Sequence, residues 1–209
     1  IVEGVLQSSY TPSGSPSIYP SKMSINTTAG FSIVSYTGNS TADATVPHGL
    51  SSTPEIVIVK NREASESWAV WHEDLSSAKR LDLNLAAGEF STSNYVKGVT
   101  SDVFQFSSSG AVINNGDDFI AYCWHSVEGF SKIGSYVGNG DNIGPFVYTG
   151  FLPAFVMLKA LTGSQNWRIH DSARNGYNAS VEGLFPNTNG TEDTEDVMDM
   201  ISNGFKLRS

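Results

Sequence analysis

The sequence is poor in cysteine, having only Cys123 among its 209 residues. One cysteine allows no disulfide within the chain and no cluster of thiolates for zinc, which excludes a disulfide-stabilised scaffold and a zinc module. Stability therefore has to come from packing or from the association of subunits. We expect no metal and no cofactor.

Basic residues and long hydrophobic runs are also scarce. The 12 Lys and Arg stand against 21 Asp and Glu, which gives a formal net charge of -9. A negative field repels phosphate backbones and anionic membranes, so we expect no nucleic-acid partner. The longest apolar runs, such as residues 153–158, are far shorter than the ~20 residues that span a bilayer, so we expect no membrane insertion.

Local motifs of common enzyme classes are missing. The chain contains no G-x-S-x-G, H-E-x-x-H or P-loop phrase, so hydrolase, zinc-protease and nucleotide-binding functions have no local support. Cys123 and His125 lie two residues apart on a predicted strand, as a thiol nucleophile and its base would. That strand is apolar on both faces, however, which predicts a buried central strand in which cysteine packs as a small hydrophobe. We therefore predict no catalytic residue and no enzyme.

What the sequence does contain favours strands joined by tight turns. It has 20 Gly, 11% aromatic residues and abundant Ser, Thr and Asn. Leu81, Leu83 and Leu85 alternate with polar residues, which predicts a strand there. Other short strands are predicted at residues 31–36, 44–46, 55–60, 68–71, 103–106 and 119–127. This pattern predicts an all-β fold built from β-sandwich, jelly-roll-like units.

The chain repeats itself with a period near 100 residues. GFSIVSYTGN at 30–39 returns as GFSKIGSYVGN at 129–139, and PEIVIVK at 54–60 returns as PAFVMLK at 153–159. We predict one repeat over 30–128 and a second over 129–209. Residues 1–29, rich in Ser, Pro and Gly, are expected to be a linker or the end of a preceding repeat.

The second repeat lacks a counterpart of the strand DDFIAYCWHSVEG at 117–129, and we expect it to be incomplete at its C-terminal strand. An open sheet edge favours aggregation unless something covers it. We therefore expect that another segment or subunit pairs with this edge, or that the natural polypeptide continues.

Aromatic residues beside polar ones mark the candidate sites for an organic ligand. Carbohydrate and peptide surfaces are often built this way, but large aromatics also pack in cores, and in a strand at most half of them face outward. The weak ligand candidates are Trp68, Trp71 and His72 in the first repeat and Trp167, His170 and Asp171 in the second.

Two turns, at 114–118 and 138–142, carry the oxygens that calcium prefers, although Asn-Gly and Gly-Asp are also common hairpin turns.

Several phrases together resemble a known family: AGFSIVSYTGN, VPHGL, PEIVIVKNR, DDFIAYCWHSVEGFSKIGSYVGNG, FVYTGFLPAFVMLK, HDSARNGYN and SNGFKLRS. They resemble a repeated β domain of phage tail-fibre and other virion-appendage proteins, a domain family of unknown function common in phages of aquatic bacteria. The resemblance covers the chain from about residue 18 to its end and brings no catalytic residues with it.

The resemblance implies a structural component of a phage particle, such as a tail fibre, spike or head-decoration fibre on the exterior of the virion. The expected partners are other virion proteins and further copies of the chain, with a trimer favoured by analogy with fibres. One alternative is a carbohydrate-binding module that recognises host-surface polysaccharide. Another is a glycan-degrading tailspike enzyme, which requires two carboxylates about 5 to 9.5 Å apart, and the sequence spacing indicates no such pair.

Overall fold

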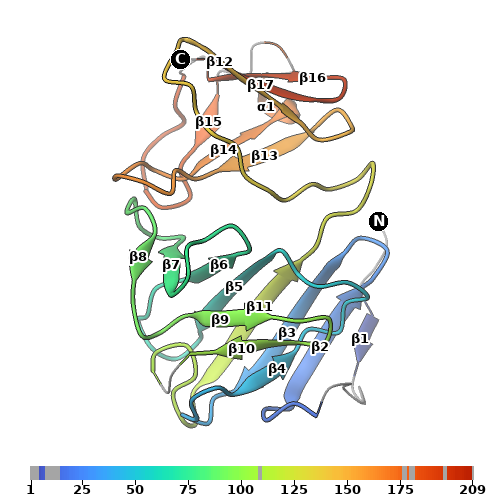
Figure 1. The fold of residues 1–209 in the computed structure, drawn as a ribbon, viewed down its shortest axis with the longest axis vertical. Coiled ribbons are helices and arrows are strands. Elements are labelled where there is room, and N and C mark those ends of the chain that lie inside the picture. Colours follow the sequence, from blue (N-terminus) through green and yellow to red (C-terminus); the bar gives the residue numbers. More distant parts are fainter. Residues whose placement is uncertain are drawn as a thin grey trace. The chain divides into compact units, whose positions relative to one another are not determined.

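The computed structural model describes residues 5–7, 15–107, 110–175, 178, 182–194 and 197–208. Within them the regular structure is antiparallel strand, apart from the four-residue helix α1 (Ser172–Asn175), so the predicted all-β fold is confirmed (Figure 1). The chain divides into two compact units. Unit 1 comprises Ile1–Leu83 and Glu89–Val127, and unit 2 comprises Asn84–Gly88 and Glu128–Ser209.

Unit 1 is a sandwich of an eight-stranded and a three-stranded sheet, and Figure 1 shows the smaller sheet lying across the larger one. The larger sheet has the order β1 (Val5–Gln7), β2 (Pro20–Asn26), β3 (Phe31–Thr37), β11 (Asp118–Trp124), β5 (Ile56–Asn61), β6 (Ala69–His72), β7 (Lys79–Asp82) and β8 (Phe90–Ser91). The smaller sheet has the order β4 (Thr45–Pro47), β10 (Val103–Phe106) and β9 (Val96–Val99).

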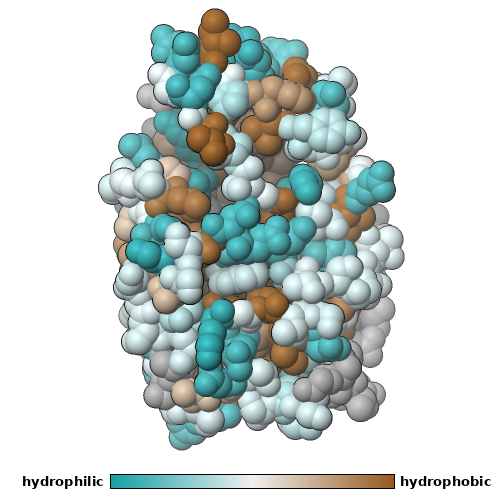
Figure 2. Space-filling model, viewed as in Figure 1, coloured by the Kyte–Doolittle hydropathy of each residue, from teal (hydrophilic) through white to brown (hydrophobic). Residues whose placement is uncertain are grey.

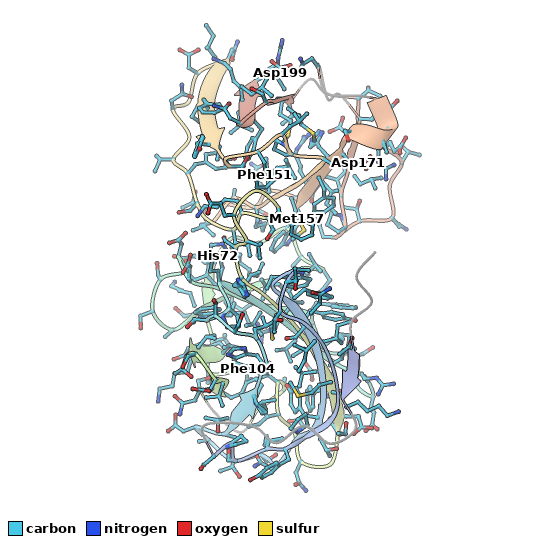
Figure 3. All side chains as sticks on the ribbon, turned by 90° about the vertical axis from the view of Figure 1, so that its right-hand side faces the viewer. His72, Phe104, Phe151, Met157, Asp171 and Asp199 are labelled. Carbon is cyan, nitrogen blue, oxygen red and sulfur yellow. The ribbon has the colours of Figure 1, made fainter. Side chains whose placement is uncertain are left out.

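The core of unit 1 lies between the inner faces of these two sheets, because alternate residues of each strand point the same way. Tyr36 on β3 is fully buried at its centre. Its ring centroid lies 6.3 Å from that of Phe104, 5.9 Å from that of Phe106 and 5.2 Å from that of Phe119. Figure 3 shows Phe104 among the side chains that fill this interior. The Tyr36 hydroxyl donates to the Val112 carbonyl at 3.1 Å, so its polar end is also satisfied inside the core.

The sequence predicts a linker or the end of a preceding repeat at 1–29, and in the structure the second half of this range contributes a strand to the larger sheet. Pro20–Asn26 forms β2, which pairs with β3 through a register shift after Pro20, and Ile18 and Met23 are core residues. Residues 1–4 and 8–14 of that range lie outside the described part. The strand predicted from the leucine alternation is also too long, because β7 ends at Asp82 and Leu85 is 43% exposed.

Unit 2 contains two three-stranded sheets. One has the order β12 (Ile143–Tyr148), β17 (Gly204–Arg208) and β16 (Met198–Ile201), and the other has the order β13 (Phe155–Leu158), β14 (Arg168–Asp171) and β15 (Gly183–Leu184). Asn84–Gly88 joins this unit through a bridge between Ala87 and Ser164 and a hydrogen bond of 2.9 Å from Lys159 Nζ to the Ala86 carbonyl.

Strand register repeats from unit 1 to unit 2. The β5–β6 pairing recurs in β13–β14 at positions 99 residues later, and the β4–β10 pairing recurs in β12–β17 at positions 101 residues later. The sequence repeat is therefore a structural repeat, down to which residues face each other across the strands. The matched pairs are Val57–Trp71 with Val156–His170, and Val46–Phe104 with Val147–Phe205.

The phrase that revealed the repeat does not form the same structure twice. In unit 1 it is β3, which is hydrogen-bonded to β2 on one side and β11 on the other. In unit 2 its counterpart at 129–139 is not part of a strand, although every residue of it is described. The backbone N–H and C=O groups of a strand form their hydrogen bonds with neighbouring strands and not within the strand itself. The conformation of this segment therefore depends on its neighbours as well as on its sequence.

Candidate functional site

The two aromatic ligand candidates of unit 1, Trp68 and Trp71, lie on opposite faces of the larger sheet. Trp71 packs against the core between the two sheets, and Trp68, three residues earlier, stacks against Tyr122 on the outer face of the larger sheet. This is the division that strand alternation predicts. Trp68 and Trp71 therefore cannot belong to one binding surface on that sheet.

The candidates in unit 2 are less accessible. Trp167 is 3% exposed and His170 is fully buried, so both are interior residues. Asp171 lies at the start of α1 (Figure 3), where its Oδ1 accepts hydrogen bonds from the backbone N–H groups of Ala173 and Arg174 at 3.0 and 3.1 Å. Asp171 thus caps this short helix. Burial removes Trp167 and His170 from the candidate ligand surface.

His72 shapes the turn that follows β6. Its Nδ1 accepts the Asp74 N–H at 3.1 Å, and its side chain is 17% exposed. Burial lowers the pKa of His72, an effect that Asp74 and Glu55 oppose. The ring is therefore neutral at pH 7, and the nitrogen that faces the turn already serves as an acceptor.

The outer face of the larger sheet carries a row of four aromatic side chains, which we call the aromatic row: Phe31, Trp124, Tyr122 and Trp68. Successive ring centroids are 4.8, 6.1 and 6.3 Å apart, and successive ring planes differ by 24°, 18° and 21°. All four side chains are half-buried. Nearly parallel, partly exposed rings of this kind offer an apolar surface on which a sugar or another flat ligand can stack.

The sequence did not reveal the aromatic row, because its members come from three distant stretches and meet only through strand register. Phe31 lies directly opposite Trp124, on β3 and β11. The interpretation of β11 as buried on both faces is correct for Phe119, Ala121 and Cys123, which are fully buried. It is wrong for the other face, which is only half-buried. The alternating aromatics within β11 were the available signal.

Unit 1 also has a cavity of about 460 Å³ beside the end of β6. Ser76 in its wall is fixed by Glu89, whose carboxylate accepts the Ser76 N–H at 2.9 Å and the Ser76 hydroxyl at 2.7 Å. That hydroxyl hydrogen bond lowers the pKa of Glu89. Aromatic, charged and hydroxyl groups line the cavity together, and they include Trp71, Tyr95, Glu73, Lys79, Lys97 and Ser77.

Thiol and metal chemistry find no support in the geometry. Cys123 is fully buried, and burial raises its pKa to about 12, so the nucleophilic thiolate is not formed. The carboxylates of Asp117 and Asp118 accept hydrogen bonds from Asn61 and Thr37 at 2.7 and 2.9 Å. Among the described residues, no three His, Cys, Asp or Glu side chains come together to hold a metal ion.

Residues 8–209 match the family described as Domain of unknown function (DUF7483), and the chain belongs to this family. The predicted membership in a domain family of unknown function is therefore confirmed, and the link to phage particles stays a prediction. Comparison with curated proteins and with solved structures gives no match. In the described part of the chain, no helix has the length and apolar character needed to cross a membrane.

Proposed function

We propose that this chain is a structural module of a phage particle, forming part of a tail fibre, spike or head-decoration fibre on the virion exterior. The observation that carries the proposal is the repetition of strand register between the two units. Units that repeat in one register form bodies that lengthen by the addition of further units. The sequence resemblance to repeated β domains of virion appendages supports the phage setting.

Association with other copies of the chain is part of this proposal, with a trimer favoured. Large apolar side chains on the surface of unit 2, among them Phe130, Val137, Ile143 and Tyr148, support it, because such side chains are typical of surfaces that meet other proteins. Figure 2 shows hydrophobic residues reaching the surface on one face of the molecule. Sedimentation of the purified chain at micromolar concentration measures this, and a clean monomer would contradict it.

Antibody labelling of intact particles tests the main proposal. Antibodies raised against this chain should decorate the outside of purified particles of the phage that encodes it, as seen by electron microscopy. Antibodies against an unrelated protein encoded by the same phage and absent from the particle serve as the control. Detection of the chain in infected cells but not on purified particles would refute a virion role.

A second candidate function, recognition of host-surface glycan, is favoured by the aromatic row. Replacing Trp68 or Trp124 by Ala removes one stacking ring, which costs roughly 0.5–1.5 kcal/mol, or about two- to twelvefold in affinity. Trp167→Phe is the matched control, because Trp167 is 3% exposed and is not a member of the aromatic row. A glycan array probed with these variants measures the effect. If the unmodified chain binds no glycan, only the structural role remains.

A further inference from the structure

In the described part of unit 2, one strand edge is unpaired at a position where unit 1 has a paired strand. In unit 1, β11 lies between β3 and β5 and pairs with both along its length. Its inward side chains, Phe119, Ala121 and Cys123, are fully buried. The centre of the larger sheet therefore depends on β11 for its hydrogen bonds and for one layer of its core.

The counterpart of β5 in unit 2 is β13, which pairs with β14 in the register that β5 makes with β6. Among the described residues, no strand pairs with the other edge of β13. Such an edge presents unpaired N–H and C=O groups that accept a further strand. Phe155 on this edge is 59% exposed, and its counterpart Ile56 faces Trp124 of β11.

Tyr136 shows that the site is partly formed. Its ring centroid lies 6.4 Å from that of Phe205, as the centroid of its counterpart Tyr36 lies 6.3 Å from that of Phe104. Tyr36 also stacks on Phe119 of β11, with centroids 5.2 Å apart and ring planes 10° apart, and is fully buried. Tyr136 remains 40% exposed. The ring that would cover it is the one that β11 supplies in unit 1.

Unit 2 also buries fewer apolar side chains than unit 1 and exposes more of them. Among the described residues, the hydrophobic core cluster of unit 1 has 18 buried members and that of unit 2 has five. Of the ten large hydrophobic side chains exposed in the described part of the chain, all but Tyr19 belong to unit 2. Those nine are Leu85, Phe130, Tyr136, Val137, Ile143, Phe146, Tyr148, Leu152 and Phe155.

We infer that unit 2 is an acceptor for a β-strand from outside residues 1–209, and that this strand pairs antiparallel with the free edge of β13. The strand has the chemistry of β11: an aromatic ring that covers Tyr136, and small apolar side chains that face Val156 and Leu158. Backbone hydrogen bonds supply affinity in this mode of binding, and the alternate side chains supply specificity. The inference rests on the repeat and does not depend on a phage setting.

A second copy of this chain is not the occupant. Its β11 is already paired on both sides within its own unit 1, so it is not free to leave. The other copy would have to offer the edge of a different strand, and pairing of one β13 with the β13 of the other copy is the symmetric case. Pairing of two β13 edges would leave Tyr136 uncovered, because it brings no counterpart of the Phe119 ring that stacks on Tyr36 in unit 1. The experiments below separate these two occupants.

The first experiment adds a synthetic peptide to the whole chain. The peptide has the sequence of residues 114–128 and carries a fluorescent label for anisotropy measurements. We expect saturable binding with one peptide per chain, and slower amide exchange at Phe155–Leu158. Phe119→Ala in the peptide should weaken binding by about tenfold or more, because its ring enters the core. Ile120→Ala, on the outer face, is the matched control and should change affinity by no more than about threefold.

The second experiment tests the register. Arg62 N–H donates to the Asp118 carbonyl at 2.9 Å, which makes Val57 and Cys123 a pair of the closer, non-hydrogen-bonded kind. The counterpart of Val57 is Val156. Val156→Cys should therefore form a disulfide with the peptide's cysteine in a glutathione buffer. Met157→Cys, one position along, points to the opposite face and should not.

A third measurement avoids the free peptide. A chain extended after Ser209 by a copy of residues 109–128 places the strand at the spacing found in unit 1, and should slow amide exchange at β13 and bury Tyr136. Three results would overturn the inference: no saturable binding, equal binding of the Phe119→Ala peptide, or no new protection in the extended chain. Disulfides between two Val156→Cys chains without peptide would identify a second copy as the occupant and also overturn it.

Discussion

Replacing Tyr36 by Phe should destabilise unit 1 by removing a single buried oxygen. The Tyr36 hydroxyl donates to the Val112 carbonyl at 3.1 Å, and both residues are buried. The ring keeps its contacts with Phe104, Phe106 and Phe119, so no cavity of ring size forms. Loss of the hydrogen bond costs about 1 kcal/mol net, and a carbonyl left unsatisfied costs about 1–3 kcal/mol. We expect the free energy of unfolding to fall by about 1–3 kcal/mol in total.

The repeat supplies the control for this prediction. Tyr136 is the counterpart of Tyr36 but is 40% exposed, so water replaces any partner its hydroxyl loses. Tyr136→Phe should change the free energy of unfolding by no more than about 0.5 kcal/mol. Urea denaturation followed by tryptophan fluorescence measures both variants, because unit 1 contains Trp68, Trp71 and Trp124 and unit 2 contains Trp167. The midpoint should shift for Tyr36→Phe while the slope stays the same.

Equal effects of the two substitutions would refute the reasoning, because they would show that the two hydroxyls have equivalent surroundings. A change below about 0.5 kcal/mol for Tyr36→Phe would show that its hydroxyl contributes no hydrogen bond of consequence. A changed slope would mean that the variant alters how much surface unfolding exposes, so the midpoint shift alone would not report the hydrogen bond.

Three further predictions follow from single residues. His48 is buried, its Nδ1 accepts the Leu50 N–H, and burial lowers its pKa. The folded state therefore binds fewer protons than the unfolded state, so stability measured in urea should fall as the pH drops below about 6.5. The fall should be less steep in the His48→Asn variant. Burial raises the pKa of Cys123 to about 12, so iodoacetamide should label this thiol at about pH 8 only after the chain unfolds. Because the thiol of the unfolded chain loses its proton at a lower pH, the free energy of unfolding should fall as the pH rises above about 9. A Cβ atom on Gly38 would lie 2.1 Å from a backbone oxygen, whereas a Cβ atom on its counterpart Gly138 would meet nothing within 4 Å. Gly38→Ala should therefore lower the melting temperature by an amount equivalent to about 1–3 kcal/mol, and Gly138→Ala should leave it unchanged.

The sequence predicted those strands whose own residues alternate or are β-branched. PEIVIVK and DDFIAYCW contain β5 and β11, because burying such residues is favourable wherever the strand lies. The strand β2 is not predicted by its own sequence, because Met23 is its single fully buried residue and its apolar residues do not alternate with polar ones. Its position comes from pairing with β3, which is a property of the fold and not of the segment.

The candidate site was harder to predict for the same reason. Trp68 and Trp167 occupy equivalent positions in the two repeats, yet the first is half-buried and the second is 3% exposed. Local sequence cannot distinguish them, because exposure depends on what packs over each position. The aromatic row likewise exists only once β3, β11 and the start of β6 are placed side by side.

The repeated register also shows where the two units are free to differ. Leu81 follows its facing residue Val70 by 11 positions, whereas Leu184 follows Ile169 by 15, so the connection that contains α1 in unit 2 is four residues longer. The paired strands are unaffected by this change of length. Insertions and deletions are therefore tolerated in the connections between strands. Within paired strands the register has to be kept, because a slip of one residue would move every side chain of the strand to the opposite face of the sheet. New loop sequences can be grafted between β14 and β15 on that basis, leaving both sheets of unit 2 as they are.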